Sequence, residues 1–313
     1  MNQDSSNDVS TWPVIDSQSP ITPSASEAPL EALSRGDIAA IICRQACTPE
    51  ACDDVVSTLV QQGLLFDPTE PIPANLQDQA IPENYYYRPG ETPDEKRDRQ
   101  AAQPAGRLRI DVGTSLGTRG SEPDSFFEHA GETQELFASL FEWDRSPIKT
   151  IYEQLGLLAT EKEVMTAREA DGRLYGPAIF RAHYGGFTYR PHYDSVRNRE
   201  RRSAFSVYEF DHQFAGVLVL QNTERDGVTA QSRLHQCFWS PEVEPHLEND
   251  TFHEFAEASS IPAVDVVLNP GDLYFFNTGC IHEVPGVAGD DARIVLATFI
   301  GYSSQRKEIY VWS

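Results

Sequence analysis

The 313-residue chain has few positive charges and no long apolar run. It carries 25 Lys and Arg against 48 Asp and Glu, for a formal net charge of −23. This charge repels phosphate backbones and anionic lipid surfaces, so we expect neither nucleic acid nor a membrane as a partner. No stretch approaches the roughly 20 apolar residues of a membrane span. We expect a soluble protein with a small-molecule partner, and the sequence leaves its oligomeric state open.

Cysteine is also scarce, and its pattern argues against two kinds of site. Cys43, Cys47 and Cys52 lie close together among the five cysteines, but they form no C-x-x-C pair of the kind found in zinc sites. The odd number of cysteines and the absence of a signal-peptide pattern favour free thiols over a disulfide framework. We therefore expect a reducing, cytoplasmic location.

One set of metal-ligand residues is spaced as a single site would require. His192 and Asp194 lie two positions apart after Pro191, and His282 follows far downstream. Side chains at i and i+2 of a strand share a face, so His192 and Asp194 can reach one metal while a second strand supplies His282. Two imidazoles and one carboxylate hold non-haem Fe(II) and leave positions open for other ligands. A His-x-Asp spacing alone also arises by chance, so the hypothesis depends on the whole set.

A fourth residue completes the set. Arg293 follows His282 by 11 residues and opens the apolar run 294–300. A buried Arg on a strand presents a planar fork of donors that suits bidentate pairing with a carboxylate. The same cavity is therefore predicted to bind a metal and an acid.

At these four positions the chain resembles the Fe(II)- and 2-oxoglutarate-dependent oxygenases. Their pattern is His-x-Asp, a distal His, and an Arg about ten residues later that binds the C5 carboxylate of 2-oxoglutarate. The resemblance is clearest from Tyr175 to Tyr302, and residues 269–277 look like the family's approach to the distal His. It implies Fe(II), 2-oxoglutarate and O2 as cofactor, co-substrate and oxidant.

The resemblance also implies roles for individual residues. His192, Asp194 and His282 would be the iron ligands, and Arg293 would pair with the far carboxylate of 2-oxoglutarate. Tyr184 is similar to a family tyrosine that hydrogen-bonds the same carboxylate. A strand tyrosine that packs in the core is the alternative for Tyr184.

Within the family, the groups most similar to this chain are small-molecule hydroxylases of free or acylated amino acids and the related aliphatic halogenases. Halogenases carry a small residue in place of the ligating carboxylate, which leaves room for chloride, whereas this chain has Asp194. We therefore expect hydroxylation, desaturation or oxidative cyclisation, with release of succinate and CO2. Val295 stands where many members have Ser or Thr, so one polar contact to the co-substrate is missing or comes from elsewhere.

Arginines gather just after the His-x-Asp motif in this acidic chain. They are Arg197, Arg199, Arg201 and Arg202. We hypothesise that Arg197 and Arg202, with Arg190 on the strand itself, hold a carboxylate-bearing substrate. A solvated loop balanced by neighbouring acids is the alternative.

The predicted fold is mainly β, a double-stranded β-helix or jelly roll with flanking helices. Residues 1–30 are polar and rich in Ser and Pro, which predicts a flexible tail. Residues 31–313 are expected to form one catalytic domain, with helical support and loops over 31–174 and the β core with the metal site over 175–313.

Particular elements follow from periodicity and from turn residues. Helices are expected within 48–63, 132–142 and 148–158, and strands at 38–43, 178–184, 214–220, 263–268, 273–276 and 294–300. The segment 67–105 is predicted to be a long loop. The polar segment 223–260 is either a lid over the site or a surface excursion.

Two other functions remain open at this stage. A protein hydroxylase that oxidises Pro, Asn or Lys side chains would need a groove for an extended peptide. A barrel that binds metal without turnover would need no co-substrate clamp, so Arg293 argues against it. The favoured hypothesis is a 2-oxoglutarate-dependent dioxygenase of a small molecule.

Overall fold

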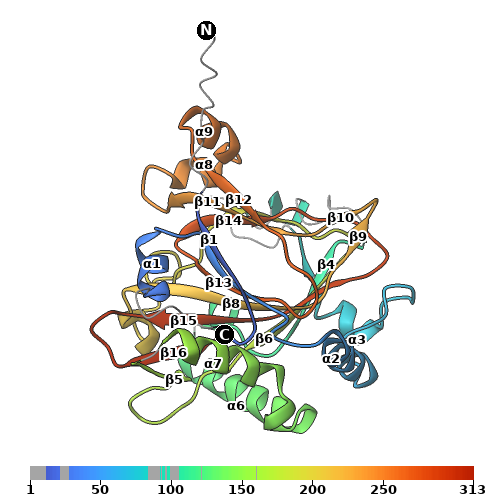
Figure 1. The fold of residues 1–313 in the computed structure, drawn as a ribbon. Coiled ribbons are helices and arrows are strands. Elements are labelled where there is room, and N and C mark those ends of the chain that lie inside the picture. The colour runs from blue at the N-terminus through green and yellow to red at the C-terminus, as the bar shows by residue number, and fades with distance from the viewer. Residues whose placement is uncertain are drawn as a thin grey trace.

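Two β-sheets face each other and enclose the interior of the protein (Figure 1). The computed structural model describes residues 12–21, 28–83, 92, 94–95, 97–98, 106–120, 122–159 and 161–313. In these residues the larger sheet has the strand order β1 (Val14–Gln18), β2 (Ala40–Arg44), β13 (Leu273–Asn277), β8 (His212–Gln221), β15 (Arg293–Tyr302), β6 (Ile179–Tyr184), β4 (Leu108–Val112) and β3 (Ile81–Pro82). Beside β15 the sheet is extended by β16 (Glu308–Trp312) and β5 (Glu163–Thr166).

The smaller sheet has four strands within the same residues, in the order β12 (Ala263–Val266), β11 (Ser232–Phe238), β14 (Cys280–Val284) and β7 (Tyr189–His192). Along the chain, β6, β8, β13 and β15 belong to the larger sheet, while β7, β11, β12 and β14 belong to the smaller one. This alternation between two facing antiparallel sheets is the double-stranded β-helix. The predicted fold class is therefore confirmed.

Helices cover the outer face of the larger sheet (Figure 1). Among the described residues the helices are α1 (Pro29–Arg35), α2 (Pro49–Gln61), α3 (Ala74–Gln77), α5 (Leu116–Arg119), α6 (Pro123–Leu140), α7 (Pro147–Leu158), α8 (Glu244–Glu248) and α9 (Phe252–Ala258), with 3-10 turns at Trp143–Arg145 and Ser206–Glu209. Leu59 of α2 and Ile151 of α7 are fully buried in one cluster with Leu218 of β8 and Leu296 of β15. Burial on both faces explains why β8 and β15 are almost continuously apolar.

The predicted helices and strands agree closely with these elements. The helix expected within 48–63 is α2, and Thr48 caps it by accepting a hydrogen bond from the Ala51 amide at 3.2 Å. The helix expected over 132–142 begins earlier, at Pro123. A short hairpin of β9 (Glu224–Arg225) and β10 (Val228–Thr229) precedes β11. The polar composition of 223–260 predicted none of these three strands.

The expectation of a flexible tail over residues 1–30 is wrong for part of that segment. Val14–Gln18 forms β1, which pairs in parallel with β2, and the Trp12 indole donates a hydrogen bond to the Gly36 carbonyl at 2.9 Å. An edge strand pairs its backbone with one neighbouring strand and leaves its other edge exposed to solvent, so a polar sequence can form one. The loop expected over 67–105 contains α3 and β3, and the rest of it falls partly outside the described residues. Among the described residues, no helix combines the length and apolarity required to cross a bilayer.

Candidate metal centre

His192 and His282 lie directly opposite each other on the paired strands β7 and β14. Asp194 follows the end of β7, where two hydrogen bonds fix its backbone. The Asp194 amide donates to the Thr278 carbonyl, and the Thr278 hydroxyl donates to the Asp194 carbonyl, both at 2.9 Å. The three predicted ligands therefore come from adjacent strands of the smaller sheet. Their side chains converge in the space between the sheets.

The geometry of the three side chains fits one metal ion. Asp194 Oδ2 lies 3.5 Å from His282 Nε2 and 3.8 Å from His192 Nε2, and one ligand atom from each residue lies within 4.8 Å of the others. Octahedral ligands about 2.1 Å from a metal lie about 3 Å apart, so small movements would close the site around an ion. This is the one group of His, Cys, Asp and Glu with such geometry among the described residues.

Hydrogen bonds orient both imidazoles. His192 Nδ1 lies 2.7 Å from the Arg190 carbonyl, and His282 Nδ1 lies 2.9 Å from the Cys280 carbonyl. A carbonyl accepts, so each Nδ1 carries the proton and each Nε2 lone pair is available to a metal. Burial, assisted by the neighbouring His282, lowers the pKa of His192 to about 3, which keeps that ring neutral.

Asp194 is held as an anion with its two oxygens in different surroundings. Burial alone would raise the pKa of Asp194, but the two neighbouring imidazoles and the charge of Arg199 hold the pKa below its ordinary value. Oδ2 faces the two imidazoles, while Oδ1 accepts a hydrogen bond from Arg199 Nη1 at 3.2 Å. One oxygen is thus directed at the metal position and the other at a cation.

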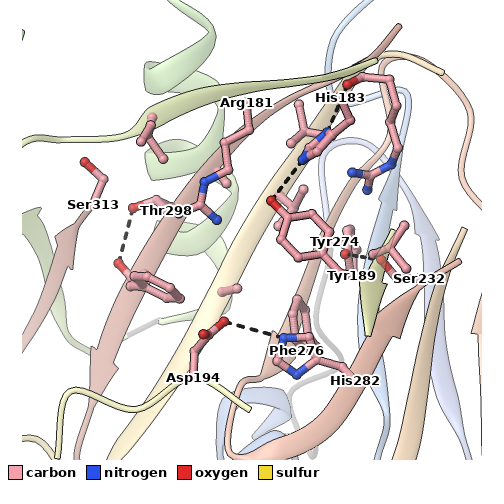
Figure 2. A pocket seen from close by; sticks show the side chains of 18 of the residues that line it. Arg181, His183, Tyr189, Asp194, Ser232, Tyr274, Phe276, His282, Thr298 and Ser313 are labelled. Carbon is pink, nitrogen blue, oxygen red and sulfur yellow. Dashed lines mark hydrogen bonds and ion pairs between the residues drawn. The ribbon is translucent and has the colours of Figure 1, made fainter. Parts of the chain in front are cut away.

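The triad opens into a cavity of about 650 Å³ between the sheets, including its mouth (Figure 2). Arg293 lines the cavity and is 6% exposed, and its Nε atom has no hydrogen-bond partner among the described residues. Burial lowers the pKa of this guanidinium, which shows that its charge lacks full compensation. A bound carboxylate would supply the missing partner.

Two hydroxyl groups lie in the same cavity. Ser232 Oγ and the Tyr274 hydroxyl are 2.6 Å apart and buried, on β11 and β13, so they approach from opposite sheets (Figure 2). They can donate to an acid held by Arg293. The polar contact that Val295 cannot make is therefore available from these two residues.

A hydrogen-bonded chain connects the clamp to the metal site. Arg109 donates to the Tyr189 hydroxyl at 3.0 Å, and this hydroxyl lies 2.9 Å from His183 Nε2. His183 Nδ1 lies 3.1 Å from the Arg293 carbonyl. Burial and the charge of Arg293 hold the pKa of His183 well below its ordinary range, so the ring is neutral and its Nδ1 proton is directed to the carbonyl. The Tyr189 ring in turn stacks on His192, with centroids 5.7 Å apart.

Arg181 is a second guanidinium in the cavity. It lies on β6 beside Val295, and its side chain extends into the cavity on the side away from Tyr274 and Ser232 (Figure 2). The Asp111 carboxylate is 4.0 Å from Arg181 Nε and is already paired with Arg109 at 2.8 Å. The cavity therefore carries two arginines in a chain of strongly negative net charge.

The prediction for Tyr184 is not compatible with the structure. Its hydroxyl donates to the Phe66 carbonyl at 3.1 Å, and its ring stacks on the Phe66 ring at 4.1 Å in the outer core. Neighbouring side chains of a strand point to opposite faces, so His183 enters the cavity while Tyr184 turns away from it. The core-packing alternative describes Tyr184.

The arginines predicted to bind substrate do not line this cavity. Arg190 pairs with Asp250 at 2.6 Å, and Arg197 lies over the Tyr208 ring with Asp211 3.7 Å away. Arg202 is likewise outside the cavity. The solvated-loop alternative therefore fits Arg197, whose side chain is 46% exposed, but not Arg202, whose Nε atom is buried.

The segment 223–260 contributes only Ser232 to the cavity lining among the described residues. Its helices α8 and α9 lie beside the smaller sheet (Figure 1). Trp239 stacks on Tyr193 with centroids 5.0 Å apart, so it does not contact the cavity directly. Neither alternative describes the whole segment, because β11 within it is a strand of the smaller sheet and pairs with β14.

The family of the chain follows from a sequence comparison. Residues 91–313, more than half of the chain, match the model of the carrier-protein-independent halogenase WelO5 family. The chain belongs to this family. The prediction of a relationship to the aliphatic halogenases is thereby confirmed.

Two further proteins are similar over shorter or more divergent matches. The L-isoleucine 3(1)-dioxygenase of Pantoea ananatis is 28% identical over 177 residues, which cover 49% of this chain and 54% of the relative. The match thus spans about half the length of that curated relative. The crystal structure of an N-substituted L-amino acid dioxygenase from Burkholderia ambifaria superposes with a TM-score of 0.50 at 13% identity, over 91% of both chains. This likeness supports the fold.

Glu200 is a buried acid in the loop that follows the ligands. Its Oε2 atom is buried without a hydrogen-bond partner among the described residues. Burial and the negative charge of Asp194 raise the pKa of Glu200 to about 7, although Arg199 and Arg202 oppose the shift. The folded protein therefore binds this proton more tightly than the unfolded chain does. The contribution of Glu200 to the free energy of unfolding therefore falls as pH rises from about 4.5 towards 7.

We predict that Glu200→Gln stabilises the metal-free protein at pH 8 by on the order of 2 kcal/mol and has little effect at pH 4.5. Glutamine keeps the shape of the side chain and removes the charge that the fold disfavours. Thermal unfolding at the two pH values tests this, with the exposed Glu248→Gln as the matched control. Equal stability of Glu200→Gln and the parent at pH 8 would contradict the prediction.

Proposed function

We propose that the chain is a non-haem Fe(II)- and 2-oxoglutarate-dependent oxygenase that oxidises an unactivated C–H bond of a small molecule of the amino-acid type. The observation that carries the proposal is the arrangement in one cavity of a His-Asp-His triad and a buried, incompletely paired Arg293. A metal-binding barrel without turnover has no use for such a clamp. Membership of the halogenase family and the similarity to an L-isoleucine dioxygenase support the proposal.

His192, Asp194 and His282 would hold the metal on one side. When bound, Fe(II) together with 2-oxoglutarate and O2 supplies the oxidising power for C–H cleavage, and the co-substrate leaves as succinate and CO2. The residues of the chain orient both imidazoles and keep Asp194 ionised. Three protein ligands leave three positions of an octahedron for co-substrate and oxygen.

The cavity is complementary to a dianion. Arg293 and Arg181 enter it from neighbouring strands, two register positions apart on β15 and β6. A short dicarboxylate can place one carboxylate at Arg293 and Ser232, and its other end near the metal and Arg181. In a chain of charge −23, a buried and a half-buried arginine at one site need a specific anionic partner.

The substrate is proposed to be a free or substituted amino acid. The L-isoleucine 3(1)-dioxygenase of Pantoea ananatis, of which the match covers 54%, acts on L-isoleucine according to its name. The cavity that holds the triad is lined by apolar side chains as well as by the two arginines, which suits a small molecule of this kind. The outcome on the substrate is hydroxylation, desaturation or cyclisation, as set by the carbon that lies nearest the metal.

Removing a ligand should abolish metal binding. We expect His282→Ala and Asp194→Ala to weaken Fe(II) binding by more than about 100-fold, because even the loss of an outer hydrogen-bond partner typically weakens it 10- to 100-fold. Anaerobic titration with Fe(II) and 2-oxoglutarate should give a weak visible charge-transfer band in the parent and none in these variants. The control is His253→Ala, since the His253 side chain is 59% exposed. A parent protein without the band and without succinate formation would favour the non-catalytic barrel.

The two cavity arginines should determine affinity for 2-oxoglutarate. We expect Arg293→Gln and Arg181→Gln each to raise its Kd by about 10- to 100-fold, because each removes charge-assisted hydrogen bonds to a carboxylate. Anaerobic calorimetry on the metal-loaded protein measures this, and Arg197→Gln outside the cavity is the matched control. Unchanged affinity in Arg293→Gln would exclude the clamp.

Halogenation is the second candidate, favoured by the family to which the chain belongs. Asp194 argues against it, because its Oδ2 points at the metal position that a halide would need. We therefore expect the parent, assayed with an accepted substrate in excess chloride or bromide, to form oxidised products without halogen. Mass spectrometry of the products tests this. A halogenated product from the parent would reverse the assignment.

A further inference from the structure

The inner face of the larger sheet changes in chemistry along β15. At one end, Arg293 pairs in register with His183, and Val295 pairs with Arg181. Two positions further along β15 lies Ala297, which pairs with Ile179 and Val217, so apolar side chains follow the charged ones. The cavity therefore has a cationic end at Arg293 and a mainly apolar end on the same strands, where Thr298 and Ser313 also line it.

The apolar end is formed by two rows of residues that pair across the sheet. One row is Ile179, Ala297 and Val217, and the next row is Phe299, Ala215 and Phe276. All six line the cavity. Two of the six are alanines, although the flanking strand sequences are rich in Val, Ile, Leu and Phe.

Alanine is a poor strand former and leaves a gap in a tightly packed interior. On β15, Ala297 and Phe299 are partly exposed while their neighbours Leu296 and Ile300 are fully buried. The exposed surface faces the cavity, so the space left by the small side chain is open rather than filled by protein. These alanines therefore widen the cavity where it is apolar.

This wide part lies beside the metal ligands. The Phe276 ring meets the His282 ring edge to face, with centroids 4.9 Å apart. Thr278, two residues after Phe276, carries the hydrogen bonds that fix Asp194. A group held over Ala215 and Ala297 would therefore lie close to the reacting position.

We propose that Ala297 and Ala215 form the floor of an aliphatic chamber that receives the hydrocarbon part of the substrate, with Ala297 limiting its length. The proposal rests on the proposed function, and it deepens it by naming the substrate class: amino acids with an unbranched or branched alkyl side chain. The cationic end binds the co-substrate, and the apolar end selects the alkyl group whose C–H bond is presented to the metal.

The chamber can be tested by filling it. Ala297→Leu adds three carbon atoms to the floor, and a difference of one methylene in an apolar pocket changes kcat/KM about 10- to 200-fold. The panel is L-alanine, L-valine, L-leucine, L-isoleucine and L-phenylalanine, each free and as its N-succinyl derivative. The comparison is between kcat/KM for the amino acid with the largest side chain that the parent accepts and kcat/KM for the next smaller one. We expect this ratio to fall at least tenfold in Ala297→Leu. Ala215→Leu should act in the same direction.

Equilibrium binding provides a readout that does not depend on turnover. Anaerobic calorimetry with Mn(II) and 2-oxoglutarate bound should show weaker binding of the larger amino acid to Ala297→Leu, with the Kd of 2-oxoglutarate unchanged. Ala263→Leu is the matched control, since Ala263 is an exposed strand residue of the smaller sheet. Thermal unfolding establishes that each variant is folded.

The outcomes separate this inference from the function on which it rests. A parent that forms no charge-transfer band with Fe(II) and 2-oxoglutarate would refute the proposed function. Where the parent forms the band, four results would refute the chamber alone. The parent turns over no alkyl amino acid of the panel, or kcat/KM falls equally for all substrates in Ala297→Leu. The other two are that the affinity for 2-oxoglutarate falls instead, or that Ala263→Leu causes the same change.

Discussion

The pairing of β7 with β14 is the constraint on which the rest of the site depends. It places His192 opposite His282 and positions the chain so that Asp194 emerges beside Thr278. Main-chain carbonyls then orient each imidazole, so the ligand geometry is set mostly by the backbone ladder of the small sheet. A register shift of one residue in this pair would turn both rings away from the cavity. The metal site is therefore a property of the fold more than of any one loop.

Charge is distributed against the overall trend of the molecule. The chain is strongly acidic, yet its central cavity contains Arg181 and Arg293, while the acids of that region are paired with other arginines or face the metal position. Burying an uncompensated cation is unfavourable, so the fold tolerates Arg293 because a carboxylate partner completes it. The proposed co-substrate would in this sense complete the folded interior.

Much of this arrangement could be predicted from the sequence, since it follows from local patterns. The His-x-Asp spacing, the distal His, Arg293 and most strands of the β core are encoded in short stretches of residues. Ser232, Tyr274 and Arg181 could not be assigned in this way, because they enter the cavity through pairing between distant strands. Tyr184 shows the same limit: a register one residue different exchanges it with His183. A signal for Arg181 did exist, two positions before His183 on the same face.

Tyr189 occupies a position with a wider consequence. Its ring lies flat against the ligand His192, while its hydroxyl joins Arg109 and His183 behind the clamp. The proposed iron ligand and the proposed diacid clamp are thus connected through one aromatic side chain. A redesign of this scaffold for a different keto acid would have to treat the two together, since a change at the acid end would reach His192 through the Tyr189 ring.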